Sequence, residues 1–281
     1  MDIIRGSFHC IKYERAEGMN FVARVQDSSP QEGTVEIFWL GQAGFLIKSP
    51  SGRITAIDPY FSEYVMRLFP DMGLGFKRLM PPPCDADSIV FDVLLMSHEH
   101  ADHFDVDSIS AMMKNGRTQV YTNAPVAQKM LEMGFDEGRV HQLTKETPVE
   151  LPDFTLIPVD CDHGAQTPDA LGFILDFGFT KVYYAGDTRL SIDRLQTPVK
   201  AKPDVAILPI NGAFGNLNGV QAAEYAGFLG CKVCIPCHFW TFPLHHGDPQ
   251  EIIDAIGEKA PHCKLVLLCQ GESYTASRES L

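Results

Sequence analysis

The sequence contains no long apolar run. No segment approaches the roughly 18 consecutive apolar residues that a membrane-spanning helix requires. The first seven residues, MDIIRGS, also lack the basic and then apolar order of a secretory signal peptide. We therefore expect a cytoplasmic protein without a membrane span.

Positive charge is scarce as well. The 281 residues include 23 Lys and Arg against 36 Asp and Glu, which gives a formal net charge of −13 at pH 7. Binding to the phosphate backbone of a nucleic acid needs a basic stripe, and the sequence contains none. We expect no nucleic-acid partner. A small anionic substrate stays open, because bound metal ions reverse the local field.

The sequence shows neither a disulfide framework nor a linker between domains. The eight cysteines are scattered or lie in apolar segments, and in a chain without an export signal they are expected as buried thiols. Residues 1–33 are polar and irregular and are predicted to form an N-terminal extension. Residues 34–281 are predicted to form a single domain.

The sequence does contain one dense group of side chains that could bind a metal. Residues 98–103 read HEHADH, and directly before them lies the compact apolar run 89–96. Such a run is typical of a strand that is buried on both faces. The group should therefore lie on the loop that leaves this strand, where active sites concentrate. A metal ion would relieve the repulsion and competition among its members, which are His98, His100, Asp102 and His103.

Strand and helix patterns alternate along the rest of the chain. An amphipathic helix is predicted from Phe61 to Leu68, within a long connection over residues 60–88. Two halves, each rich in strands first and α/β later, predict a two-sheet sandwich with helices outside. Strands are expected at 36–40, 45–48, 53–58, 89–96, 118–122, 154–159, 171–177, 181–185, 205–210, 232–236 and 264–269, and further helices near 108–114, 124–133, 220–229 and 249–258.

Four more candidate side chains follow apolar runs in the same way. His163 and Asp187 each come shortly after one, and Gly186 lets the backbone turn so that Asp187 points away from the sheet edge. His238 and Asp58 end two others. The matching positions predict that these residues meet the 98–103 group at one edge of the sandwich.

With these motifs in this order, residues 34–270 resemble the metallo-β-lactamase superfamily. The resemblance implies a four-layer αββα sandwich with a mononuclear or dinuclear metal site at one edge. It implies Asp58 as a carboxylate that orients a ligand histidine from behind. One metal would be held by His98, His100, His163 and Asp187, and a second by Asp102, His103, His238 and the shared Asp187.

A narrower resemblance lies in the flanking segments. WLGQAGF at 39–45, the 60–88 insertion, YAGDT at 184–188 and IPCH at 235–238 look like the L-ascorbate-6-phosphate lactonase branch. Lactonases of that branch are cytoplasmic, manganese-dependent and oligomeric, which implies a homo-oligomer here. The predicted function is a metal-dependent hydrolase that opens a phosphorylated sugar-acid lactone such as L-ascorbate 6-phosphate.

The chemistry of the ligand set limits the cofactor. Imidazoles and carboxylates without a thiolate suit one or two divalent ions, Mn²⁺ or Zn²⁺, with Fe²⁺ also open. Two such cations activate a bridging water against an ester carbonyl, and catalysis is expected to involve Asp102, Asp187 and His238. Alternatives are a phosphodiesterase of the phospholipase D kind and a non-catalytic metal or ligand sensor.

The substrate contacts are less determined. Candidate partners for a phosphate are Arg53, Lys77, Arg78 and Arg189, with ordinary solvated charges as the alternative. The helix in the 60–88 insertion could be a substrate lid, an oligomer contact, a membrane-facing surface or a cover for the core. Specificity is expected to come from this insertion.

Overall fold

The computed structural model describes residues 20–165 and 167–277. Most of the predicted N-terminal extension, residues 1–19, lies outside the described residues. One sheet contains β1 (Thr34–Gly41), β2 (Gly44–Lys48), β3 (Ile54–Ile57), β4 (Val93–Met96), β5 (Gln119–Thr122), β6 (Val140–Gln142) and β14 (Ser273–Ser277). The other contains β7 (Val149–Glu150), β8 (Thr155–Asp160), β9 (Leu171–Asp176), β10 (Lys181–Tyr184), β11 (Val205–Pro209), β12 (Val233–Cys237) and β13 (Lys264–Leu265).

Each sheet is antiparallel at one end and parallel at the other. The strand orders are β14-β1-β2-β3-β4-β5-β6 and β13-β12-β11-β10-β9-β8-β7. Pairing is antiparallel from β14 to β3 and parallel from β3 to β6, and the second sheet repeats this with antiparallel β7 to β10 and parallel β10 to β13. The two similar halves predicted from the sequence are thus confirmed.

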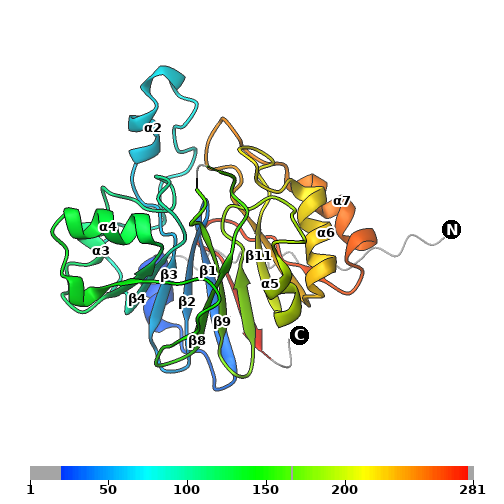
Figure 1. The fold of residues 1–281 in the computed structure, drawn as a ribbon, viewed down its shortest axis with the longest axis horizontal. Coiled ribbons are helices and arrows are strands. Elements are labelled where there is room, and N and C mark those ends of the chain that lie inside the picture. Colours follow the sequence, from blue (N-terminus) through cyan, green and yellow to red (C-terminus); the bar gives the residue numbers. More distant parts are fainter. Residues whose placement is uncertain (1–19, 166, 278–281) are drawn as a thin grey trace.

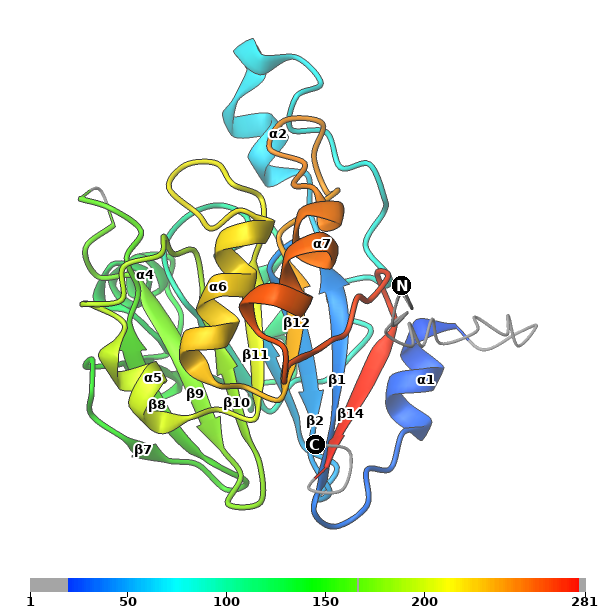
Figure 2. The same cartoon turned by 90° about the vertical axis from the view of Figure 1, so that its right-hand side faces the viewer.

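Helices cover the outer faces of both sheets, which makes four layers (Figures 1 and 2). The first sheet is covered by α1 (Phe21–Asp27), α3 (Ile109–Met112) and α4 (Ala124–Glu132), followed by the short η2 (Glu137–Arg139). The second sheet is covered by α5 (Gln196–Ala201), α6 (Gly219–Leu229) and α7 (Pro249–Lys259). The single-domain αββα sandwich predicted from the sequence is confirmed.

Strand β1 shows why the central strands read as continuous apolar runs. Side chains alternate across a strand, so Ile37 and Trp39 enter the core between the sheets, while Phe38 and Leu40 pack under the outer helices. Both faces of the strand are buried, and neither needs polar residues.

The segment before β1 was expected to be irregular, but it contains the helix α1. The Asn20 side chain caps this helix by accepting from Ala23 N at 2.8 Å. At its other end, Lys48 Nζ donates to the carbonyls of Val25 and Gln26 at 2.7 and 2.9 Å. This lysine comes from β2, so a sequence pattern confined to residues 1–33 could not reveal the helix end.

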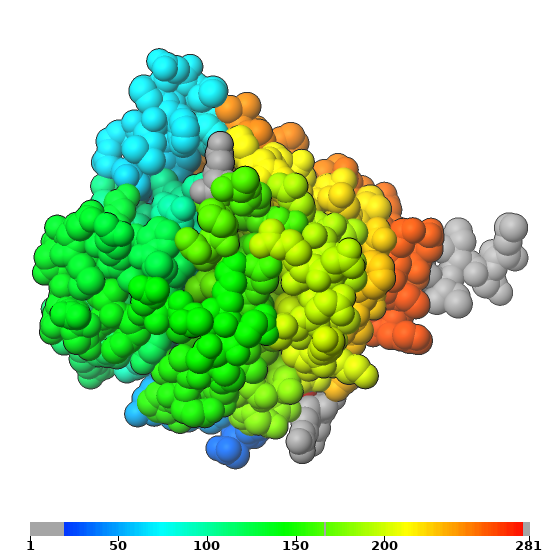
Figure 3. Space-filling view, viewed as in Figure 1, coloured from blue at the N-terminus to red at the C-terminus, as the bar shows by residue number. Residues whose placement is uncertain are grey.

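The insertion between β3 and β4 also differs from its prediction. The expected helix from Phe61 is shorter, since α2 spans Tyr64–Leu68 and is followed by η1 (Pro70–Met72). The buried Asp105 carboxylate accepts from the backbone N–H groups of Phe61 and Ser62, both at 2.9 Å, and this holds the first residues in a turn. Figure 3 shows the insertion, in cyan, projecting from the body of the molecule.

None of the helices in the described residues is long and apolar enough to cross a membrane.

Candidate metal centre

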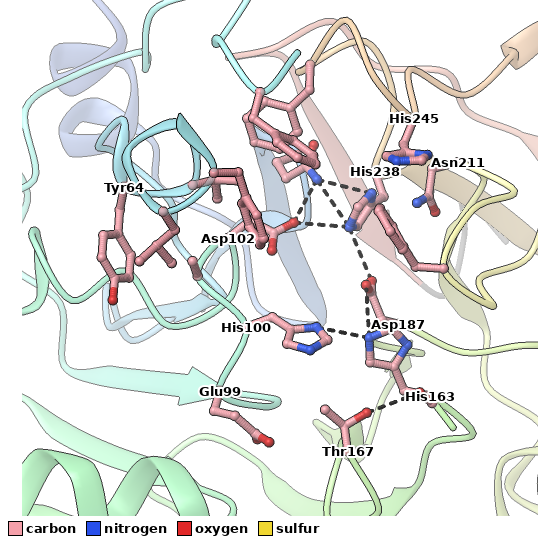
Figure 4. A pocket seen from close by; sticks show the side chains of 18 of the residues that line it. Tyr64, Glu99, His100, Asp102, His163, Thr167, Asp187, Asn211, His238 and His245 are labelled. Carbon is pink, nitrogen blue, oxygen red and sulfur yellow. Dashed lines mark hydrogen bonds and ion pairs between the residues drawn. The ribbon is translucent and has the colours of Figure 1, made fainter. Parts of the chain in front are cut away.

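The candidate ligands meet where several strands end. Asp58 follows β3 and the 98–103 loop follows β4, while His163 comes after β8, Asp187 after β10 and His238 after β12. In mixed sheets such as these, the carboxyl ends of neighbouring parallel strands open at one edge. All seven predicted ligands and Asp58 therefore gather at the edge that the sequence predicted (Figure 4 shows most of them).

The first group contains His98, His100, His163 and Asp187, whose ligand atoms all lie within 4.8 Å of one another. His100 Nδ1 lies 3.0 Å from His98 Nε2 and 3.0 Å from His163 Nε2. The distance from His163 Nε2 to Asp187 Oδ2 is 3.7 Å. Three imidazole nitrogens and one carboxylate oxygen thus point at a common position.

The second group contains Asp102, His103 and His238. Asp102 Oδ2 lies 3.2 Å from His238 Nε2 and 3.8 Å from His103 Nε2. The other oxygen of Asp187, Oδ1, lies 3.3 Å from His103 Nε2 and 3.4 Å from His238 Nε2. Asp187 therefore stands between the groups and turns one oxygen to each.

These atoms fit a cation better than they fit one another. His103 Nε2 and Asp187 Oδ1 are fully buried, and neither makes a hydrogen bond within the described residues. Buried polar atoms without a partner are costly and rare in folded proteins. Imidazole nitrogens and carboxylate oxygens are ligands that divalent transition metals accept, and the convergence of two such groups suits one or two ions.

The charges of the two groups differ in the metal-free protein. Burial lowers the pKa of His98 and of His163, so these imidazoles are neutral. Burial would also lower the pKa of His238, but Asp187 and Asp102 outweigh it and raise that pKa to about 9. Burial disfavours the ionised form of Asp102 and of Asp187, but the nearby imidazoles outweigh this and hold the pKa of both carboxyl groups below the usual range. In the second group, metal ions would compete with protons.

Comparison with known proteins agrees with this geometry. Residues 55–239 match the family model described as a beta-lactamase superfamily domain. The chain belongs to this superfamily. A UPF0173 metal-dependent hydrolase of Aeropyrum pernix is 30% identical over 247 residues, which cover 84% of this chain and 95% of that protein. Another, from Hyperthermus butylicus, is 28% identical over 239 residues, 84% of this chain and 97% of the relative.

Solved structures share the fold. A metallo hydrolase from the archaeon Ignicoccus hospitalis superimposes with a TM-score of 0.70 and 22% identity, covering 87% of this chain and 99% of that one. The family model and the Aeropyrum pernix relative place the chain in the UPF0173 metal-dependent hydrolase family of the beta-lactamase superfamily. The names of these relatives specify metal-dependent hydrolysis, and the lactonase branch is not established by them.

In this hydrolase Asp58 lies behind the ligands, fully buried. Its Oδ1 accepts from Ser97 N at 2.7 Å, and its Oδ2 accepts from Tyr184 Oη at 2.7 Å and from Ser97 Oγ at 2.5 Å. The same Oδ2 lies 2.7 Å from His103 Nδ1, and Ser97 Oγ lies 2.9 Å from His98 Nδ1. The carboxylate thereby contacts one ligand directly and a second through a hydroxyl, which suits the orienting role that the resemblance implies.

Gln42 is a site residue that sequence reasoning missed. Its Nε2 donates to Asp102 Oδ2 at 2.9 Å and lies 3.1 Å from each ring nitrogen of His238. The backbone carbonyl of Gln42 accepts from Trp39 Nε1 at 3.0 Å and from His238 N at 2.9 Å. The signal in the sequence was a lone amide among small residues, in the turn between two strands whose side chains are almost all apolar.

Backbone strain concentrates around this site. The backbone φ is +50° at Gln42, +43° at Asp58 and +61° at His238, a left-handed region that residues other than glycine seldom adopt. Each such residue costs on the order of 1–3 kcal/mol and persists only where its surroundings hold it. The hydrogen bond from His238 N to the Gln42 carbonyl joins two of the three.

A cavity of about 480 Å³ opens over the ligands. Lys129 and His245 lie on its wall, whereas none of the four proposed phosphate partners does. Arg53 pairs with Asp153 and Lys77 with Glu63 on the surface, while Arg189 faces Asp162. Arg78 is buried and donates to the carbonyls of Tyr60 and Met80, which is a structural role.

Proposed function

We propose that this hydrolase opens a lactone or another carboxylic ester at a centre of one or two divalent ions, Mn²⁺ or Zn²⁺, with Fe²⁺ as a further candidate. The observation that carries the proposal is the pair of ligand groups joined by Asp187, whose two oxygens face different groups. Ions bound there would supply an activated water and withdraw charge from the reacting carbonyl.

Three side chains are proposed to take part in catalysis. Asp102 lines the cavity beside His238, so its carboxylate can accept a proton from the attacking water and return it to the leaving alkoxide. Asp187 keeps the two groups at a fixed separation, and His238 completes the group on the Asp102 side. The remaining proposed ligands are His98, His100, His103 and His163.

The lining of the cavity favours a carbonyl substrate over a phosphodiester. A phosphoryl group is normally held by several cationic or backbone donors. Apart from the proposed metal ligands, this lining has the ammonium group of Lys129 and the imidazole of His245, whose pKa burial lowers. The phosphate of L-ascorbate 6-phosphate, the lactone named by the sequence resemblance, would have the same two partners. The alternative enzyme is a phosphodiesterase of the phospholipase D kind, and the alternative without catalysis is a metal or ligand sensor.

The test begins with protein purified without chelators, in which bound metals are measured by elemental analysis. The metal-loaded protein is then assayed on simple lactones, L-ascorbate 6-phosphate and bis(p-nitrophenyl) phosphate. Asp187→Ala and His98→Ala should lose both bound metal and lactone turnover. His141→Ala is the matched control, because His141 stacks on Tyr121 away from the cavity.

The outcomes separate the candidates. Turnover of the phosphodiester alone would favour the phosphodiesterase. Stoichiometric metal without turnover of any compound would favour the sensor. The cytoplasmic location and the homo-oligomer expected from the sequence stay predictions, which fractionation and light scattering would check.

A further inference from the structure

One side of the cavity is an aromatic and aliphatic surface, which we call the apolar wall. It comes from two segments that are far apart in sequence, the 60–88 insertion and the loop after β12. Its residues are Tyr64, Val65, Leu68, Phe69, Phe76 and Phe242. In Figure 4, Tyr64 stands on the opposite side of the ligands from Asn211 and His245.

The aromatic rings of the wall pack against one another. The ring of Phe76 contacts Phe242 edge to face with centroids 5.7 Å apart, and it contacts Phe69 at 5.1 Å. Tyr60 adds a further edge contact to Phe242 at 6.0 Å. Such pairs stabilise an arrangement beyond the area they bury, so the rings keep their places when the cavity is empty of substrate.

Backbone hydrogen bonds fix the two segments to each other. Leu79 N donates to the Thr241 carbonyl at 2.8 Å, and Leu244 N donates to the Gly75 carbonyl at 2.9 Å. Figure 3 shows the cyan insertion beside the orange loop that follows β12. The wall therefore has a defined shape.

The wall also continues down to the metal loop. Ala101, between the proposed ligands His100 and Asp102, belongs to the same buried apolar cluster as Val65 and Phe76. A group resting on the wall would therefore adjoin the position where the ester carbonyl reacts. A cavity of about 480 Å³ also lies within the usual range for small-molecule sites, about 300–1,000 Å³.

The apolar wall has few groups that could form hydrogen bonds with a sugar or a phosphate. Its side chains carry one hydroxyl, that of Tyr64, among six residues, so a polyol placed there would lose hydrogen bonds to water without replacing them. An alkyl chain or an aromatic ring would instead exchange water for apolar contact, which is favourable.

We propose that the substrate of this hydrolase is a lactone or ester bearing an apolar substituent, an alkyl chain or a ring, which lies against the apolar wall while the carbonyl reacts at the metal centre. The proposal rests on the proposed ester hydrolysis for its chemistry. It makes Leu68 and Phe69, on the outer part of the wall, residues that determine specificity.

The experiment compares a series of γ-lactones whose side chain lengthens from none to hexyl. One methylene in an apolar pocket is worth about tenfold or more in kcat/KM, so kcat/KM should rise steeply along the first members and then level off. Leu68→Gln and Phe69→Gln should each reduce the ratio between the longest and the shortest lactone by about tenfold. Both positions are about half exposed, which limits the effect of these changes on folding.

Leu74→Gln is the matched control. Leu74 lies on the same insertion, is 72% exposed and does not line the cavity, so its substitution should leave the ratio at the wild-type value. Equal kcat/KM across the series, or a preference for L-ascorbate 6-phosphate, would overturn the proposal. So would an unchanged ratio in Leu68→Gln together with loss of an oligomer, because the wall would then be a subunit contact.

A binding measurement distinguishes this failure from failure of the proposed function. 3-Hexylcyclopentanone has a five-membered ring with the carbonyl and the chain in the same relative positions as the γ-hexyl lactone, but no ester bond. Its affinity, measured by calorimetry, therefore does not depend on turnover. Binding that weakens in Phe69→Gln and not in Leu74→Gln would support the wall even if no lactone is hydrolysed. Absence of binding to the metal-loaded wild type, with lactone turnover intact, would overturn the wall alone.

Discussion

Replacing Asp58 with Asn should weaken metal binding without removing a single ligand. The Asp58 carboxylate receives four donors, namely Ser97 N, Ser97 Oγ, Tyr184 Oη and His103 Nδ1. An amide of the same shape has one oxygen and one NH₂ group, and the NH₂ group would face a donor. The Nδ1–H of His103 then faces either the NH₂ group or a neutral amide oxygen in place of the carboxylate. In both orientations the preference of His103 to turn Nε2 towards Asp187 weakens.

Two magnitudes are expected, one for metal affinity and one for the stability of the metal-free protein. Side chains that orient metal ligands typically contribute 10- to 100-fold in metal affinity, so we expect the dissociation constant of one ion to rise by about that factor in Asp58→Asn. Hydrogen bonds to charged groups contribute about 1.5–3 kcal/mol each. With the carboxylate fully buried, the free energy of unfolding of the metal-free protein should fall by about 3 kcal/mol.

Asp105→Asn provides the control. Asp105 is also fully buried and accepts from two backbone N–H groups and the Ser62 hydroxyl, but it contacts no proposed ligand. Both variants should unfold at lower urea concentration, while only Asp58→Asn should show weakened metal binding in competition with a chromophoric chelator. Equal metal affinity in the two variants would refute the orienting role of Asp58.

Three further predictions address metal binding and stability. In Gln42→Leu, Asp102 loses a hydrogen-bond donor, and a calorimetric titration should show weaker binding of one ion and unchanged binding of the other. Removal of metal with a chelator should lower the Tm in differential scanning calorimetry, because an ion present at 100 times its Kd stabilises the folded state by about 2.7 kcal/mol. At Asp160, burial opposes ionisation, but Arg194 and Lys145 outweigh it and lower the pKa below its usual value. The stabilisation from Asp160 is therefore present above the pKa of the unfolded chain and is lost as pH falls through the folded pKa; the difference in urea midpoint between wild type and Asp160→Asn should be present at pH 7 and should disappear in strong acid.

The sequence was informative where a feature depends on its own segment. The placement of His98 to His103 after a strand follows from the apolar run just before them, and the structure has β4 directly before this loop. Their meeting with His163, Asp187 and His238 follows from the shared position of each at a strand end. The position at a strand end marks a segment, and the choice of His163 and His238 within their segments came from the resemblance to the metallo-β-lactamase superfamily. What the structure adds is the distances between these residues and the way Asp187 divides its two oxygens.

Features that depend on distant partners could not be predicted. Gln42 becomes part of the site only through Asp102, 60 residues away. The start of α2 is decided by Asp105, which lies 43 or more residues beyond the turn it holds. Arg78 resembled a phosphate partner in the sequence, but its guanidinium instead packs over the Tyr60 ring at 4.7 Å. Composition and periodicity do not report such contacts.

The loop 98–105 connects the metal centre to the apolar wall. It carries four of the proposed ligands, contributes Ala101 to the apolar cluster, and holds the base of the insertion through Asp105. Because Val65 and Phe76 pack in one buried cluster with Ala101, a change in this packing would move the residues that place His100 and Asp102. The outer positions of the wall, Leu68 and Phe69, are half exposed and lie outside the buried cluster that contains Ala101, which Phe69 touches at Phe76. Substrate preference can change at these two positions while the metal geometry stays as it is, whereas changes at Val65 or Phe76 would alter both together.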